Sequence, residues 1–255
     1  MRLVIKIGTS TIAHSGGRLN IRRTEELCKV ISDLKNSGLE IIIVTSGAIG
    51  MGVGKLSLKE RPSDMATKQA CAAVGQCELM YVYDKLFSEY NHTVAQILIT
   101  ASDIENENRH HNFSVTLNRL LDLGVIPIIN ENDTIATEEI VIGDNDTLAA
   151  IVATSAKADL LVLLSDIDGL YTADPHNNPD ARLIPEVYEL TERIMNLGGD
   201  PGSALGTGGM RTKLTAASIC TEAGCDMIIA NGSDPGLLYR IADGESVGTR
   251  FVADR

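Results

Sequence analysis

The sequence predicts an α/β protein in which helices cover both faces of a mostly parallel sheet. Six apolar runs of strand length occur along the 255-residue chain, and helical patterns separate them. The runs lack polar alternation, which is typical of strands that are buried on both faces. Strands that alternate with helices in this way build a parallel sheet, so an α/β sandwich is the expected fold class.

The elements follow from the same patterns in chain order. The expected strands are Leu3 to Ile7, Glu40 to Val44, Val94 to Ile99, Val125 to Ile129, Asp159 to Leu164 and Asp226 to Ala230. The expected helices are Arg22 to Ser37, Met65 to Phe87, Phe113 to Leu123, Asn145 to Lys157 and Met210 to Ala223. Gly38 follows the first of these helices, as a C-terminal glycine stop predicts.

Two further segments, Thr134 to Ile142 and Tyr171 to Tyr188, are expected to form hairpins or short strands that decorate the sheet. No Pro/Ser-rich linker, charge run or internal repeat separates two halves of the sequence. One domain with two lobes is therefore expected.

Composition excludes several classes of function. Hydrophobic residues make up 44% of the chain and charged residues 22%, as in globular proteins, while aromatic residues are only 4%, so the core is expected to be aliphatic. A net charge of −12 argues against a nucleic-acid or anionic-membrane partner. The five cysteines lack CxxC spacing and the five histidines lack metal-ligand spacing, so reduced thiols and no zinc site are expected. No signal segment or membrane span is visible, which predicts a cytoplasmic protein.

The chemistry gathers directly after strands, where open α/β sheets bind their ligands. In VIKIGTS, Lys6 interrupts an apolar strand just before a glycine, and a buried lysine is costly unless it meets an anion. A lysine at a sheet edge that reaches solvent is the alternative. The second exit, Thr45 to Gly52, offers a hydroxyl and free backbone donors to a carboxylate or phosphate, although a plain glycine-rich turn has the same composition.

Two more strand exits carry polar groups. The segment Ile129 to Thr134, taken with Gly143 to Asp146, has carboxylates and amides that suit an ammonium group, or that could organise lysines and metal. Ordinary surface loops have this composition too. In the segment Leu164 to Pro175, Ser165 and Asp166 suit the edge of a ribose or adenine, and an acidic structural turn is the alternative.

The fifth exit, Gly206 to Lys213, resembles an anion cradle at the start of a helix. Its glycines allow successive N–H groups to converge on a phosphate, and Lys213 adds a full charge. The spacing does not match the Walker pattern, so a phosphate loop here belongs to another fold. A flexible loop before an ordinary helix is the alternative. Taken together, the five exits predict an enzyme that handles anions.

These segments together resemble the amino acid kinase family, and within it the members that phosphorylate the γ-carboxylate of glutamate at the start of proline synthesis. The resemblance runs from about Leu3 to Val252 through VIKIGTS, VTSGAIGMG, QACAAVGQ, NENDT, GDND, LLSDIDGLYTADP and TGGMRTK. It implies a three-layer αβα sandwich around a mainly parallel sheet of about eight strands. It also implies a single kinase domain over residues 1–255, with a substrate lobe in the N-terminal part and an ATP lobe in the C-terminal part. Many of these members continue into a C-terminal PUA domain, whereas this chain stops at Arg255, so a short form without that domain is expected.

The resemblance implies roles for individual residues. Lys6 would contact the transferred phosphate, Lys213 the ATP phosphates, and Asp146 would hold both lysines. Glutamate would be bound by Ser46, Asp133 and Asn145. The implied ATP-binding residues are Lys6, Ser165, Asp166, Thr207, Gly208, Gly209, Met210, Arg211, Thr212 and Lys213. Mg²⁺ would be carried mainly by the ATP phosphates, without a metal site on the protein.

The resemblance also implies partners and rivals. The partners are L-glutamate and ATP, with feedback inhibition by proline and a homo-oligomer, either dimer or tetramer. We expect Asp133 to pair with the α-ammonium of glutamate, which favours free over N-acetylated glutamate. The rivals are sister kinases for N-acetylglutamate, aspartate, uridylate or carbamate, and a non-catalytic amino-acid sensor. NENDT with GDND favours glutamate, and the presence of Lys6, Asp146 and Lys213 together argues against a sensor.

Overall fold

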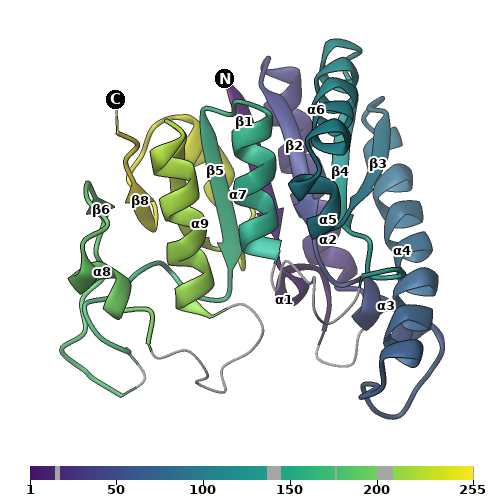
Figure 1. Ribbon diagram of the computed structural model, residues 1–255, viewed down its shortest axis with the longest axis horizontal. Helices are drawn as coiled ribbons and strands as arrows, with labels where there is room; N and C mark the ends of the chain where they lie inside the picture. Colours follow the sequence, from purple (N-terminus) through teal and green to yellow (C-terminus); the bar gives the residue numbers. More distant parts are fainter. Residues whose placement is uncertain (15–17, 137–144, 176, 200–208, 255) are drawn as a thin grey trace.

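An eight-stranded sheet runs through the protein, and helices cover both of its faces (Figure 1). The computed structural model describes residues 1–14, 18–136, 145–175, 177–199 and 209–254. The strands are β1 (Arg2–Ile7), β2 (Glu40–Thr45), β3 (Val94–Ile99), β4 (Ile126–Glu131), β5 (Leu160–Ser165), β6 (Glu186–Val187), β7 (Asp226–Asn231) and β8 (Thr249–Phe251). The helices are α1 (Thr9–Ile12), α2 (Ile21–Asn36), α3 (Ala48–Lys55), α4 (Met65–Ser88), α5 (Ala101–Glu105), α6 (Glu107–Asp122), α7 (Asn145–Ser155), α8 (Glu192–Asn196), α9 (Met210–Glu222) and α10 (Leu237–Ala242).

The strand order is β3-β4-β2-β1-β5-β7-β8-β6. Every neighbouring pair is parallel except β7 with β8, so β8 and β6 run against the other six strands. This confirms the mainly parallel sheet of about eight strands. Strands β2, β4 and β3 lie on one side of β1, and β5 and β7 lie on the other, so the direction in which strands are added reverses at β1. Open α/β sheets bind ligands outside the carboxyl ends of the strands at such a point.

The core divides into two aliphatic layers, one on each face of the sheet. Alternate residues of β1 show the division, because Val4 packs in one layer while Leu3 and Ile5 pack in the other. Helices α6, α7 and α9 close the first layer and lie in front of the sheet in Figure 1. Helices α2, α4 and α10 close the second layer. The α/β sandwich expected from the apolar runs is therefore confirmed.

Helix α3 forms over a glycine-rich segment because it packs unusually close to α4. A Cβ atom placed on Gly75 of α4 would lie 1.8 Å from the carbonyl oxygen of Ala48, and one on Gly52 would lie 1.9 Å from that of Cys71. Only glycine fits at these two positions. The segment Thr45 to Gly52 is thus a strand end and a helix N-terminus held against α4, rather than a plain turn.

Several boundaries differ from the expectation. Strand β4 continues through Asn130 and Glu131, whose polar side chains ended the expected strand but are buried here. Helix α6 begins six residues before the expected start, because the side chain of Asn106 caps a polar first turn that has no apolar pattern.

The helices α1, α3, α5, α8 and α10 and the strand β8 were not expected, and all are short, whereas β6 lies within the expected segment Tyr171 to Tyr188. Tyr171 and Leu183 form an antiparallel bridge, as expected of a decorating hairpin, while residues 137–142 of the other expected hairpin lie outside the described residues. No helix in the described ranges is long and apolar enough to cross a membrane.

Candidate active site at the carboxyl ends of the strands

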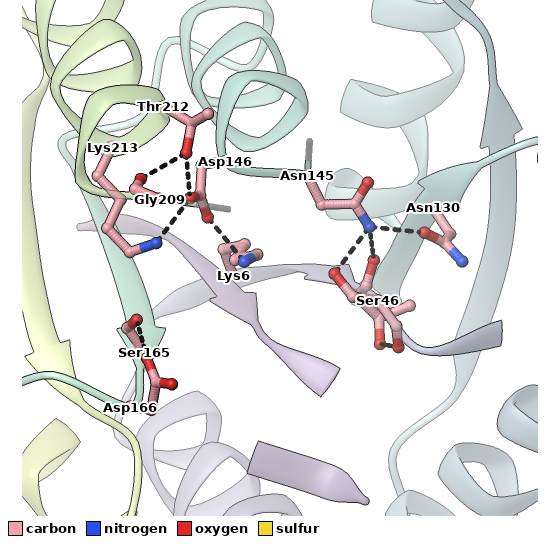
Figure 2. A network of polar contacts seen from close by, with 11 residues as sticks. Lys6, Ser46, Asn130, Asn145, Asp146, Ser165, Asp166, Gly209, Thr212 and Lys213 are labelled. Atoms are coloured by element: carbon pink, nitrogen blue, oxygen red, sulfur yellow. Dashed lines mark hydrogen bonds and ion pairs between the residues drawn. The ribbon is translucent and has the colours of Figure 1, made fainter. Parts of the chain in front are cut away.

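Lys6, Asp146 and Lys213 meet at the carboxyl end of β1 (Figure 2). Lys6 Nζ lies 2.7 Å from Asp146 Oδ1, and Lys213 Nζ lies 3.0 Å from Asp146 Oδ2. Lys6 comes from β1, Asp146 from the first turn of α7 and Lys213 from the first turn of α9. One carboxylate therefore holds two ammonium groups that are far apart in sequence, with one lysine on each oxygen.

Burial makes this cluster electrostatically strong. The exposed fractions of the Lys6, Asp146 and Lys213 side chains are 12%, 1% and 5%. Burial alone would raise the pKa of Asp146, but the charges and hydrogen bonds of Lys6 and Lys213 outweigh it and hold that pKa below its ordinary value. With Asp146 ionised, the two lysines leave an excess of positive charge, and an anion is the group that such a site attracts.

A second polar network lies beside this cluster and joins Ser46, Asn130 and Asn145. Asn145 Nδ2 donates to the Thr45 carbonyl at 2.6 Å, to Ser46 Oγ at 2.8 Å and to Asn130 Oδ1 at 3.0 Å. Asn145 and Asp146 are consecutive at the start of α7, so the helix presents one residue to each network (Figure 2). The two networks therefore share one rigid support.

Backbone donors add to this network at the N-terminus of α3. Gly47, the residue before the helix, has φ +97, and no side chain among the described residues caps the first N–H groups of α3. The first N–H groups of a helix have no partner within it, and the helix dipole favours negative charge there. Ser46 and the start of α3 thus form a site that suits a carboxylate.

Asp133 lies three residues beyond Asn130, in the turn that follows β4, and its side chain is half-buried. Burial raises the pKa of Asp133, and the positive charge of Arg61 opposes part of that rise. Among the described residues no hydrogen bond or ion pair joins Asp133 to Ser46 or Asn145. The structure thus brings Ser46 and Asn145 together and leaves Asp133 outside their network.

The N-terminus of α9 carries the other half of the glycine-rich loop. Gly209 is the residue before the helix and, like Gly47, has no capping side chain. Thr212 Oγ1 lies 2.8 Å from the Gly209 carbonyl and 3.2 Å from Asp146 Oδ2. Met210 is half-buried and Arg211 is exposed. Thr207 and Gly208, which the sequence also assigns to ATP, lie outside the described residues.

Ser165 and Asp166 stand at the end of β5, the neighbour of β1. Ser165 Oγ donates to Asp166 Oδ1 over 3.2 Å, and Asp166 is exposed. Both line a cavity of about 200 Å³ at the carboxyl ends of β1, β5 and β7, together with Ser10, Thr11, Arg23, Asn231, Gly232 and Ser233. Ser165 and Asp166, which are assigned to ATP, thus lie on the β5 side of Lys6, and Ser46, which is assigned to glutamate, lies on the β2 side.

Residue reasoning missed parts of this site. Asn130 stands in the NENDT motif without being singled out, although an amide that ends an apolar strand was a usable signal. Gln76, which accepts a hydrogen bond from Asn130 at 2.9 Å, lies in the middle of α4 and ends the QACAAVGQ motif, but it was given no role. Within the described ranges, no three His, Cys, Asp or Glu side chains group so as to hold a metal ion.

A mainly parallel α/β sheet with two lysines buried at its strand ends is an arrangement typical of proteins that handle phosphate. The chain belongs to the amino acid kinase family, whose model matches residues 1–231. It is 51% identical to the glutamate 5-kinase of Clostridium perfringens over 258 residues, covering 100% of this chain and 96% of that protein. The glutamate 5-kinase of Clostridium acetobutylicum is 53% identical, over 98% of this chain and 94% of that protein.

A longer relative and a solved structure extend the comparison. The glutamate 5-kinase of Carboxydothermus hydrogenoformans is 54% identical over 98% of this chain, which covers 67% of that protein. The solved UMP kinase from Bacillus anthracis superposes with a TM-score of 0.68 at 18% identity, covering 100% of this chain and 96% of that one. At that identity the likeness shows a shared fold.

Proposed function

We propose that this chain transfers the γ-phosphoryl group of ATP to the γ-carboxylate of L-glutamate, giving L-glutamyl 5-phosphate and ADP in the first step of proline synthesis. The observation that carries the proposal is the buried Lys6–Asp146–Lys213 cluster, which lies beside the polar network of Ser46 and Asn145. Relatives that are 51 to 54% identical and carry the name glutamate 5-kinase support the choice of substrate.

The reaction joins two anions, so charge and alignment are what the protein must supply. A carboxylate oxygen of glutamate attacks the γ-phosphorus, and the bond to the β–γ bridging oxygen breaks with its electron pair leaving on ADP. The attacking carboxylate has an ordinary pKa of about 4.3 and is already ionised at neutral pH, so no general base is needed. Fixed positive groups and in-line placement lower such a barrier.

Within this scheme Lys6 and Lys213 are the catalytic residues that contact phosphate. Lys6 stands on β1 between the proposed glutamate and ATP sides and faces the transferred group, while Lys213 at the N-terminus of α9 faces the phosphates of ATP. Asp146 is the third residue of the set and acts as an organiser. It keeps both ammonium groups in place before substrate arrives, and its lowered pKa keeps it ionised across the neutral range.

The glutamate side uses Ser46, Asn145 and Asp133. Because Asn145 Nδ2 can only donate, Ser46 Oγ accepts from it, and the Ser46 hydroxyl hydrogen is free to donate to a substrate carboxylate. Asp133 supplies the negative charge for the α-ammonium, which an N-acetylated glutamate lacks.

The ATP side combines the α9 N-terminus with the end of β5. The N–H groups from Gly209 to Thr212 and the loop before them, including Thr207 and Gly208, bind phosphates, with Met210 and Arg211 beside them. Ser165 and Asp166 bind the nucleoside. We place substrate binding mainly in the N-terminal part of one kinase domain and ATP binding mainly in the C-terminal part.

Mg²⁺ fits this site as a companion of ATP. The described residues hold no cluster of three metal-ligating side chains, and the lysine cluster itself would repel a bare cation. When bound with ATP, Mg²⁺ would neutralise part of the charge of the phosphates. The phosphates of ATP would hold it, with no dedicated protein ligands.

The proposal also covers the compartment, the oligomeric state and the regulation of the enzyme. We place the enzyme in the cytoplasm, because all five cysteines are free and four of them are buried thiols, as in a reducing compartment. We also propose a homo-oligomer, either dimer or tetramer, and feedback inhibition by proline. Inhibition is measured at subsaturating glutamate, and unchanged turnover at millimolar proline would refute that part.

A substrate panel tests the function. ADP release is measured with L-glutamate, N-acetylglutamate, aspartate, UMP and carbamate as acceptors, each with MgATP. We expect glutamate to be the acceptor with the highest kcat/KM. Preference for another acceptor would replace the proposal with a sister kinase, and ATP consumption by none of them would support a non-catalytic sensor.

A further inference from the structure

The polar network of the glutamate side continues past Asn130 into helix α4. Asn130 Nδ2 donates to Gln76 Oε1 at 2.9 Å, and both side chains are buried, with exposed fractions of 2% and 7%. Gln76, Asn130, Asn145 and Ser46 thus form a chain of hydrogen bonds from the middle of α4 to the start of α3. Gln76 is its far end and lies outside the residues assigned to substrate.

The direction of every bond in this chain is fixed by backbone groups. The Glu131 N–H can only donate, so the atom of Asn130 that it meets at 2.9 Å is Oδ1. Asn130 therefore presents its amino group to Gln76, which turns Oε1 of Gln76 towards Asn130. At the other end the Thr45 carbonyl can only accept, which fixes Nδ2 of Asn145. This chain of hydrogen bonds, called the relay below, has one orientation. It leaves the Ser46 hydroxyl hydrogen free to donate to an acceptor outside the relay.

The backbone of Gln76 is held as firmly as its side chain. Its neighbour Gly75 packs so closely on α3 that a Cβ there would lie 1.8 Å from the Ala48 carbonyl. Ala48 is the first residue of α3, two residues after Ser46. The Gln76 amide is therefore fixed relative to the substrate segment from two directions, by helix packing and by the relay.

We propose that Gln76 is a positioning residue for glutamate binding, which acts through Asn130 to hold the Asn145 amide and, through it, the Ser46 hydroxyl in the donor arrangement that a carboxylate requires. The inference rests on the proposed function. Gln76 makes only this bond, because its buried Nε2 meets no partner among the described residues. Without the Gln76 acceptor the buried Asn130 Nδ2 loses this bond, and an unmade bond in a buried site costs more than a made one contributes. Loss of the Gln76 acceptor allows the Asn130 side chain to turn. The two Nδ2 hydrogens of Asn145 are then distributed differently among Thr45, Ser46 and Asn130.

The test is a double-mutant cycle between Gln76→Met and Asn130→Ala. Gln76→Met keeps the length of the side chain and removes the acceptor. We expect it to raise KM for glutamate about tenfold, the order expected for one buried hydrogen bond, while KM for ATP changes by less than about twofold. In the Asn130→Ala background the same substitution should change KM for glutamate by less than about twofold, because its route to substrate is already cut.

Asn118→Leu is the matched control. Asn118 is a half-buried amide of α6 that bonds to Arg2 at 3.1 Å and to Ser114 at 2.8 Å, at the opposite end of β1. It should lower thermal stability and leave KM for glutamate unchanged. If Gln76→Met does not fold, Gln76→Ala is measured in the same cycle.

Each outcome has a separate meaning. An unchanged KM for glutamate in Gln76→Met, or equal rises in KM for glutamate and ATP, would overturn the positioning role. Additive effects in the cycle would overturn its route through Asn130. If the wild-type chain does not phosphorylate glutamate, the proposed function fails first. Isothermal titration of glutamate against wild type and Gln76→Met still tests the inference in that case, with a tenfold weaker Kd expected and an equal Kd contradicting it.

Discussion

Asp146→Asn tests how much the double ion pair contributes, because it removes one charge and almost no volume. The substitution leaves Lys6 and Lys213 buried with an amide in place of the carboxylate. One amide oxygen can still accept from one lysine, but the amino group that replaces the other oxygen faces an ammonium donor. Two positive charges then lie close together without the negative group that balanced them.

The magnitude follows from this burial. Removal of one partner from a buried ion pair costs about 3–5 kcal/mol, so the free energy of unfolding should fall by about 3 kcal/mol at neutral pH. Loss of a preorganised charge arrangement around a reacting group lowers kcat by about 10²- to 10³-fold, and we expect that range here. MgATP should raise the thermal midpoint of Asp146→Asn more than that of wild type, because bound phosphates supply the missing negative charge.

Urea denaturation and ADP release measure these effects. Glu245→Gln is the control, because Glu245 pairs with Arg240 at 2.7 Å on the exposed surface, and such pairs contribute about 0.2–1 kcal/mol. The reasoning is refuted if Asp146→Asn unfolds within about 1 kcal/mol of wild type and keeps its turnover. Loss of turnover without loss of stability would show that the two lysines tolerate each other, and that outcome contradicts the electrostatic account.

Three further predictions follow from other residues. Asp133→Asn should raise KM for glutamate at least about tenfold with little change in kcat, since a charge-assisted bond to the ammonium contributes about 1.5–3 kcal/mol, and an unchanged KM would contradict the assignment. Because burial raises the pKa of Asp133, kcat/KM for glutamate should fall with decreasing pH already above the range where ordinary aspartates titrate, and Asp133→Asn should lose that step. Gly75→Ala places a Cβ 1.8 Å from the Ala48 carbonyl, so the free energy of unfolding should fall by about 3 kcal/mol, whereas Gly50→Ala, whose Cβ meets only Thr9 at 3.8 Å, should be neutral in stability.

Much of the fold could be predicted because its signals are local. The six long parallel strands are apolar throughout, and each appears in the structure within about two residues of its expected bounds. The strand that was missed, β8, has three residues, and β6, which has two, was expected only as part of a decorating segment, because so few residues show no periodicity. Helix α3 was missed because its glycines argue against a helix locally, and only packing against α4 explains them.

The candidate site also has residues with a local signal and residues whose contacts depend on the folded chain. Lys6 could be found from the residues alone, because a lysine in an apolar strand requires a compensating group. Only the family resemblance pointed to Asp146 as that group, since Asp146 lies 140 positions away and the pairing exists only in the folded chain. The bond between Gln76 and Asn130 could not be predicted from the residues for a related reason. Their bond joins a helix to a strand end that are 54 residues apart.

Trapping of the acyl phosphate with hydroxylamine, in wild type and in Lys6→Ala, tests the central claim most directly. Wild type should form γ-glutamyl hydroxamate and ADP in equal amounts, and only when glutamate is present. Lys6→Ala should fold, because Asp146 keeps its bond to Lys213, and should form hydroxamate at least about 10²-fold more slowly. ADP release without glutamate, or full hydroxamate formation by Lys6→Ala, would contradict the account.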